Sequence, residues 1–203
     1  REVQKNLSGL KQAVNGTIKA IALTVEMRDP YTSGHQHRVA HLARAIAEEI
    51  ELSGDQAEGV YTAAAIHDIG KISLPAEILT KPGRLSDIER KMIQTHSQDK
   101  NDILKDINFP WPISQIVLQH HERMDGSGYP QGLAGDEILL EARILGVSDV
   151  VETMASHRPY RPSIGLDKAL EEISQNKTVL YDPQVVDACL KLFADKSFEF
   201  PSP

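Results

Sequence analysis

The chain has 203 residues, 40% of them hydrophobic and 25% charged, which is typical of a folded globular protein and unlike a disordered one. Its 29 acidic and 22 basic side chains give a formal net charge of −7, which argues against a nucleic-acid duplex or an anionic membrane as the general partner. The sequence contains neither an apolar run of about 20 residues, as a membrane span requires, nor a signal-peptide pattern.

The single cysteine, Cys189, excludes an internal disulfide bond. It follows Val185 and Val186 at helical spacing, so we expect it to be a small core residue. A chain without disulfides fits the reducing cytoplasm, which is the expected location.

Apolar residues recur three and four residues apart along almost the whole chain, without convincing strand-like alternation. This periodicity predicts an all-α fold. Residues 1–28 carry a narrow apolar seam made of Leu7, Leu10, Val14, Ile18, Ile21 and Val25. The seam predicts a separate N-terminal helix that relays signals or dimerises. The alternative is a terminal helix packed on its own domain, because the seam is shorter than the roughly three to four heptads of a secure coiled coil.

Turn and capping signals divide the rest of the chain into further helices. One helix is expected to begin near Ser33, and another runs through Val60 to Lys71. A further helix begins at the capping box formed by Ser86 and Glu89 and runs through His96. The others are expected over residues 113–122, 136–156, 166–175 and 183–193. Asp182 and Pro183 are a suitable N-cap and first-turn pair for the last helix.

Potential metal ligands stand at the ends of these helices or on them. They are His35, His67, Asp68, His96, His120, His121 and Asp149. Imidazoles and carboxylates without thiolates suit manganese, iron, nickel or zinc and argue against a structural zinc site. The set is too large for one ion and matches a dinuclear site, where a bridging hydroxide attacks phosphorus while the metals neutralise the developing charge. The alternative is a set of satisfied core and surface histidines.

The order of these residues resembles the HD-GYP family, a branch of the HD-domain phosphohydrolases. The resemblance covers residues 29–193 and rests on His67–Asp68 with Gly70–Lys71, on His120–His121, and on the Gly-Tyr-Pro loop that ends at Pro130. It implies an HD-domain helical bundle over residues 29–203 that hydrolyses cyclic di-GMP to linear pGpG, and in some members onward to GMP. Residues 1–28 then form the helix that links this domain to an upstream sensor or receiver domain.

By the same resemblance, the candidate ligands bind two divalent ions, with Asp68 as the bridge. Lys71 is then a positive donor at the scissile phosphate, and a helix-capping lysine is its alternative. Tyr129, Arg158 and Arg161 hold the nucleotide in this reading, although both arginines also suit a helix C-terminus without any ligand. Arg38 and Arg123 are expected to pair with carboxylates instead.

The metals implied are iron or manganese, ahead of nickel, zinc or magnesium. Relatives that bind three metals carry a glutamate one helical turn before the first histidine, and this chain has Tyr31 there. Two ions are therefore expected. A third would require Asp29 or Glu26 to replace that glutamate through a bend in the chain.

Three other functions remain as alternatives. The first is a catalytically silent cyclic di-GMP receptor, and the second is a phosphodiesterase for another cyclic dinucleotide such as 3′,3′-cGAMP. The third is a general HD-domain nucleotidase or ppGpp hydrolase, against which the Gly-Tyr-Pro loop is the main argument. Besides the nucleotide, the expected partners are the upstream domain and a second copy of the chain, paired through the N-terminal helix.

Overall fold

The structure is a computed structural model that describes residues 2–28, 33–81, 83, 86–156 and 164–201. The side chains of residues 7, 8, 11 and 95–102 lie outside this description. The helices are α1 (Glu2–Glu26), α2 (His35–Glu49), α3 (Gly54–Ala65), α4 (Ala76–Leu79), α5 (Asp87–Leu104), α6 (Ile113–Gln119), α7 (Leu140–Ala155), α8 (Leu166–Gln175) and α9 (Pro183–Ala194), with 3-10 helices η1 (Ile69–Ser73) and η2 (Gly135–Glu137). The described residues form isolated β-bridges but no strand, which confirms the all-α prediction.

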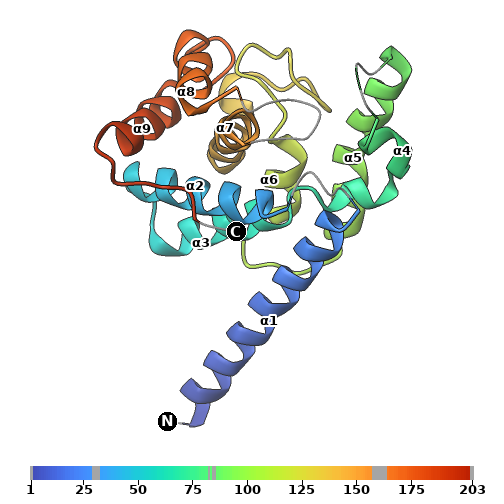
Figure 1. Ribbon diagram of the computed structural model, residues 1–203. Coiled ribbons are helices and arrows are strands. Elements are labelled where there is room, and N and C mark those ends of the chain that lie inside the picture. The colour runs from blue at the N-terminus through green and yellow to red at the C-terminus, as the bar shows by residue number, and fades with distance from the viewer. Residues whose placement is uncertain (1, 29–32, 82, 84–85, 157–163, 202–203) are drawn as a thin grey trace.

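The core lies where α2, α3 and α7 meet, with α8 and α9 packed on α7 (Figure 1). Leu42 of α2 and Ile144 of α7 are fully buried there, because each belongs to an apolar stripe at helical spacing. Cys189 is also fully buried, as predicted. Within the described part of the chain, no helix is both long and apolar enough to cross a bilayer.

Helix α1 projects away from the bundle over most of its length (Figure 1). The described side chains of its N-terminal half are exposed, whereas Ile18 and Ile21 pack against the core cluster and Val25 is 3% exposed. The helical prediction for this segment is confirmed, and its last two turns are part of the packed domain.

The end of α1 holds two other elements in place. The Glu26 carboxylate accepts hydrogen bonds from the backbone N–H groups of Gly34, at 2.9 Å, and Gln36, at 3.3 Å, and so caps the start of α2. The Arg28 guanidinium donates to the carbonyl oxygens of Ile72 and Leu74, at the end of η1 and directly after it. We call Glu26 and Arg28 the α1 clasp, because together they tie α1 to α2 and to η1.

Three predicted helix boundaries were wrong. The third helix ends at Ala65 rather than Lys71, and the helix predicted over 113–122 ends at Gln119. In both cases, a histidine ring just past the helix end donates a hydrogen bond to the carbonyl oxygen three residues earlier. This bond occupies an oxygen that would accept a backbone N–H if the helix continued. The helix predicted from residue 136 begins at Leu140, because Ile138 and Leu139 are extended and only the short η2 precedes them.

The predicted caps are present. Ser86 and Glu89 bond reciprocally at the start of α5, at 2.8 Å and 3.3 Å. Asp182 accepts from the N–H groups of Gln184, at 2.8 Å, and Val185, at 3.2 Å, and also binds Arg143 at 2.9 Å. Asp182 is therefore both the N-cap of α9 and a link to α7.

The substitution Asp182→Ala is expected to lower the free energy of unfolding by about 2 kcal/mol, because it removes the cap and leaves Arg143 without this partner. Urea unfolding measures the loss. Asp187→Ala is the matched control, since it removes an exposed ion pair with Lys177 and should cost less than about 0.5 kcal/mol. Equal losses in the two variants would contradict the role of Asp182.

Candidate metal centre

Two buried histidines present the same ring nitrogen to one region of the domain. The Nδ1 of His67 lies 2.7 Å from the carbonyl oxygen of Ala64, and the Nδ1 of His120 lies 2.7 Å from that of Val117. Because a carbonyl oxygen only accepts, each Nδ1 donates a proton, and the lone pair of each neutral ring is on Nε2. Both rings are therefore oriented and in the tautomer that binds a metal ion through Nε2.

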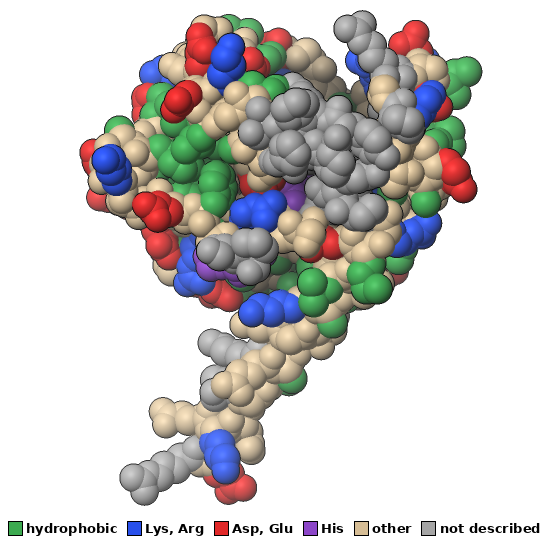
Figure 2. Space-filling model, in the orientation of Figure 1, with side chains coloured by type: hydrophobic (Ala, Val, Ile, Leu, Met, Phe, Trp, Pro, Cys, Tyr) green, Lys and Arg blue, Asp and Glu red, His purple; other side chains and the backbone are tan. Residues whose placement is uncertain are grey.

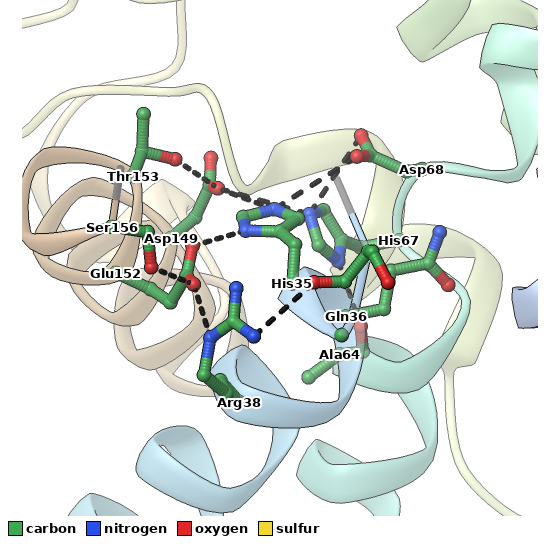
Figure 3. A network of polar contacts seen from close by, with 12 residues as sticks. His35, Gln36, Arg38, Ala64, His67, Asp68, Asp149, Glu152, Thr153 and Ser156 are labelled. Atoms are coloured by element: carbon green, nitrogen blue, oxygen red, sulfur yellow. Dashed lines mark hydrogen bonds and ion pairs between the residues drawn. The ribbon is translucent and has the colours of Figure 1, made fainter. Parts of the chain in front are cut away.

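His35, the first residue of α2, completes a run of three imidazoles. Its ring centroid lies 5.3 Å from that of His67, which in turn lies 5.3 Å from that of His120. The Nδ1 of His35 makes a short hydrogen bond to the Glu152 carboxylate of α7, so its Nε2 is also turned toward the centre (Figure 3). Three elements of the bundle thus contribute one imidazole each.

Two aspartates lie among these rings. Asp68 places Oδ2 3.9 Å from Nε2 of His35 and Oδ1 3.7 Å from Nε2 of His67. Asp149 places Oδ1 3.3 Å and 3.8 Å from the same two nitrogens. Two overlapping groups result, each with its donor atoms within 4.8 Å of one another: His35, His67 and Asp68, and His67, His120 and Asp149.

Asp149 and Glu152 carry negative charge in spite of their burial. Burial opposes the charge of Asp149, but its hydrogen bond to His35 and the nearby His67 hold its pKa well below the usual value. Burial likewise opposes the charge of Glu152, yet the His35 contact lowers its pKa to about 2. Burial lowers the pKa of His35, whereas the hydrogen bonds to these two acids raise it to about 9. Asp149 and Glu152 are therefore ionised carboxylates that face the imidazole of His35.

Three further side chains, Lys71, His121 and Tyr129, lie beside the residues of the centre. The Lys71 ammonium lies 2.6 Å from Oδ2 of Asp68. The His121 ring lies 3.9 Å from that of His120 and is stacked on Tyr129, with centroids 4.7 Å apart. Burial, followed by the charge of Asp149, raises the pKa of Tyr129 to about 12, so its hydroxyl remains protonated. In Figure 2, a histidine side chain and a basic side chain are visible near the middle of the domain.

The Gly-Tyr-Pro loop is held against the two histidines by a carboxylate and a glycine. Glu122, which is 5% exposed, accepts from the N–H groups of Gln131, at 2.7 Å, and Leu133, at 3.1 Å. A Cβ on Gly128 would lie 2.4 Å from the Cα of Glu122, so only glycine permits this approach. The loop therefore sets the position of Tyr129.

A second glycine brings α7 to the centre. A Cβ on Gly146 would lie 2.6 Å from the carbonyl oxygen of His120, so the helix that carries Asp149 can pack closely on His120 only through glycine. The Gln119 side chain accepts from the N–H of Leu139, at 2.8 Å, and fixes the start of the same helix. This packing aligns Asp149 with the imidazoles.

Glu152 was missed by the sequence reasoning. It is 1% exposed, and besides His35 it binds Nε of Arg38 at 2.6 Å and the hydroxyl of Ser156 at 2.5 Å. The expectation that Arg38 pairs with a carboxylate is therefore confirmed (Figure 3). The available signal was an acid one helical turn after Asp149, on a face that also carries apolar residues.

The structure brings together part of the predicted site. His35, His67, Asp68, His120 and Asp149 share one centre, with Lys71 in contact with Asp68, and His121 and Tyr129 beside His120. The side chain of His96, on α5, and all of Arg158, Arg161, Tyr31 and Asp29 lie outside the described residues. Arg123 donates to the carbonyl oxygen of Glu122, at 2.9 Å, and faces the Tyr181 ring, so these contacts are not the carboxylate pairing that was expected for it.

Residues 19–185 match a family model described as HD domain. The chain belongs to the HD domain family. It is 37% identical over 188 residues, or 92% of its length, to a Xanthomonas campestris protein named cyclic di-GMP phosphodiesterase response regulator RpfG, of which it covers 50%. It is 34% identical over 187 residues, 91% of its length, to a Vibrio cholerae protein named 3′3′-cGAMP-specific phosphodiesterase 3, of which it covers 41%.

The fold of this HD domain is shared with a solved structure of a cyclic GMP-AMP specific phosphodiesterase of V. cholerae. The TM-score is 0.70 at 18% identity, over 89% of this chain and 49% of that one. The predicted resemblance to the HD-GYP branch is confirmed by the family model and the curated relatives. The chain spans about half the length of the curated relatives that it matches.

The residues of the centre fit a metal. HD-domain phosphohydrolases are metal-dependent, and oriented Nε2 atoms beside ionised carboxylates form a donor set suited to transition metals. The anchored Nδ1 atoms resemble the carboxylate–histidine and carbonyl–histidine pairs that surround bound metals. The centre is thus a donor set that could hold a metal, and His35, His67, Asp68, His120 and Asp149 are its candidate ligands.

The substitution Glu152→Gln is expected to weaken Mn²⁺ binding by about 10- to 100-fold, because His35 loses the ionised acceptor that aligns it. Calorimetric titration of the metal-free protein measures the affinity. Glu48→Gln is the matched control, since Glu48 is also bound to an arginine but is exposed and remote from the centre. Unchanged affinity in folded Glu152→Gln would show that Glu152 does not align His35 for the metal.

Proposed function

We propose that this domain hydrolyses a phosphodiester bond of cyclic di-GMP to give linear pGpG, and the expected two-ion centre argues against complete conversion to GMP. The observation that carries the proposal is the convergence of His35, His67 and His120 on Asp68 and Asp149 within an HD domain. Relatives named cyclic di-GMP phosphodiesterase support the substrate class. The second candidate substrate is 3′,3′-cGAMP, because other relatives of similar identity carry that specificity in their names.

Two divalent ions, iron or manganese in preference to nickel, zinc or magnesium, are the proposed cofactors. They would be held by His35, His67, Asp68, His96, His120, His121 and Asp149. When bound, they supply Lewis-acid stabilisation of the phosphate and an activated hydroxide. Asp68 is the proposed bridge, since its two oxygens turn toward different imidazoles.

The position of Glu26 supports two ions rather than three. Both of its carboxylate oxygens accept backbone N–H groups at the start of α2. Metal binding by Glu26 would compete with these contacts and open the α1 clasp. Glu26 is therefore a poor replacement for the glutamate that three-metal relatives carry.

The remaining side chains are assigned to the nucleotide. Lys71 carries a positive charge next to Asp68 and would stabilise the charge that develops on the scissile phosphate. Tyr129, held protonated and stacked on His121, offers a hydrogen-bond donor and a ring edge to the nucleotide. Arg158 and Arg161 are proposed to bind phosphate or guanine edges.

The function is tested by incubating the metal-loaded protein with cyclic di-GMP, 3′,3′-cGAMP and ppGpp separately and resolving the products by chromatography. We expect linear dinucleotide from a cyclic substrate, none after chelation of the metals, and none from Asp68→Ala. Its matched control is Asp55→Ala, which alters an exposed acid bound to Trp111. Tight binding of cyclic di-GMP without turnover would establish a receptor, and cleavage of ppGpp alone would place the chain among general HD-domain nucleotidases.

Residues 1–28 are proposed as the linker to an upstream sensor or receiver domain, with residues 29–203 as the cytoplasmic catalytic domain. A relative of this chain is named a response regulator and is twice as long as the matched region. Helix α1 is proposed to pair two chains, because Val3, Leu10 and Val14 are 79%, 63% and 47% exposed on it. Large apolar side chains on a projecting helix favour a second helix as partner.

Sedimentation velocity tests the pairing. The double variant Leu10→Lys, Val14→Lys should shift a dimer to monomer, because it places charges in the apolar seam. The control is Gln12→Lys with Asn15→Lys, which adds the same charge beside the seam. A wild-type chain that sediments as a monomer at high concentration would contradict the dimer.

A further inference from the structure

A second group of histidines lies on α2, on the side turned away from the metal centre. His37 and His41 are four residues apart, so their side chains are separated by only about 40° around the helix axis. His35 precedes His37 by two residues, or about 200°, and points into the centre instead. His37 is exposed and His41 is half-buried, whereas His35 is 3% exposed.

The two rings approach each other through the same ring nitrogen, Nε2. Nε2 of His37 and Nε2 of His41 are 3.1 Å apart, and the ring centroids are 4.3 Å apart. Two imidazole nitrogens on one ion, each at about 2.1 Å and separated by an angle of about 95–110°, lie roughly 3.1–3.4 Å apart. The observed separation is within that range, so one ion could bind both nitrogens after the two rings rotate to turn their lone pairs toward it.

We propose that His37 and His41 form a second metal site, which takes a transition metal ion of the Ni²⁺, Cu²⁺ or Zn²⁺ type. The site does not depend on the proposed function of the domain. Its two donors are imidazoles, which suit these ions and not Mg²⁺ or Ca²⁺. The remaining coordination positions face solvent through His37 and take water.

The backbone under the site is rigid, which favours chelation. Val39, Ala40 and Leu42, between and beside the two histidines, are fully buried in the core. On the outer side, the Tyr61 ring packs edge-on against His41 at 5.5 Å and restricts its rotation. Both donors are therefore held on one helix face before an ion arrives, and little conformational entropy remains to be lost.

Charges near the site set the affinity. Burial, together with His37, Arg44 and Lys19, lowers the pKa of His41, so this ring is neutral and able to bind metal at neutral pH. The charge of Arg44 is offset by Glu48 and Glu58, at 3.0 Å and 3.2 Å. Lys19 of α1 lines a hollow together with His37 and Tyr61, so its charge opposes an incoming cation. Histidine also reaches the surface near the junction with α1 in Figure 2.

The site has a practical consequence for the metal content of the protein. An ion at His37 and His41 adds to those in the catalytic centre, so a third equivalent of nickel, copper or zinc need not be a third catalytic ion. The two kinds of ion differ in chemistry, since the surface site lacks the carboxylates that favour manganese.

Titration of the untagged protein with NiCl₂, with its catalytic ions already bound, tests the proposal. We expect one additional equivalent of Ni²⁺ in the wild type, weakened at least about tenfold in His37→Gln and in His41→Gln, since each leaves a single imidazole. Exchange of Ni²⁺ into the catalytic centre is common to the wild type and the double variant His37→Gln, His41→Gln, so the difference in Ni²⁺ bound by these two proteins reports this site. Equal Ni²⁺ binding by the wild type and the double variant would overturn the proposal.

Two further measurements separate chelation from a general loss of structure. Lys19→Gln removes a repelling charge and should tighten Ni²⁺ binding, a change of opposite sign to that of the histidine variants; weaker binding would contradict the site. Cu²⁺ bound to the wild type should give an electron paramagnetic resonance spectrum with coupling to two imidazole nitrogens. Coupling to one nitrogen would exclude the chelate.

Discussion

The metal centre depends on the hydrogen bond that each buried imidazole makes through Nδ1 to a fixed oxygen. At His67 and His120 the acceptor is a backbone carbonyl three residues earlier, so one hydrogen bond both ends the helix and aims Nε2 at the centre. At His35 the acceptor is Glu152 on a different helix, so its orientation depends on how α2 packs on α7. The protein thus builds its ligand geometry from helix termini and one buried carboxylate.

The spacing of apolar residues predicted where the helices lie, but not where the helices next to the metal centre end. The helix over residues 166–175 was predicted with the bounds that α8 has, since its apolar stripe begins after Gly165 and ends before Asn176. The ends near His67 and His120 were misplaced because apolar spacing continues past them, while the ring hydrogen bond that stops the helix leaves no trace in the spacing of apolar residues. This local competition of a side chain for a backbone acceptor depends on the rotamer of the ring.

The candidate metal ligands could be named from the sequence, whereas the residues that hold them in place could not. His35, His67, Asp68, His120 and Asp149 could be named because imidazoles and acids at helix ends point to a metal. Glu152, Glu122 and Glu26 could not be assigned, because a glutamate on an amphipathic helix or before a loop looks like any solvated acid. Burial alone distinguishes these three: they are 1%, 5% and 8% exposed, and each holds another element in place.

The α1 clasp connects the projecting helix to two elements next to the centre. With 25 residues, α1 is a rod about 37 Å long. At its C-terminal end, Glu26 accepts hydrogen bonds from the first turn of α2, next to His35. Arg28, just after the helix, donates hydrogen bonds to the chain that follows Asp68 and Lys71. A displacement of this helix would therefore act on the first turn of α2 and on the end of η1 together, and both elements adjoin candidate ligands of the centre.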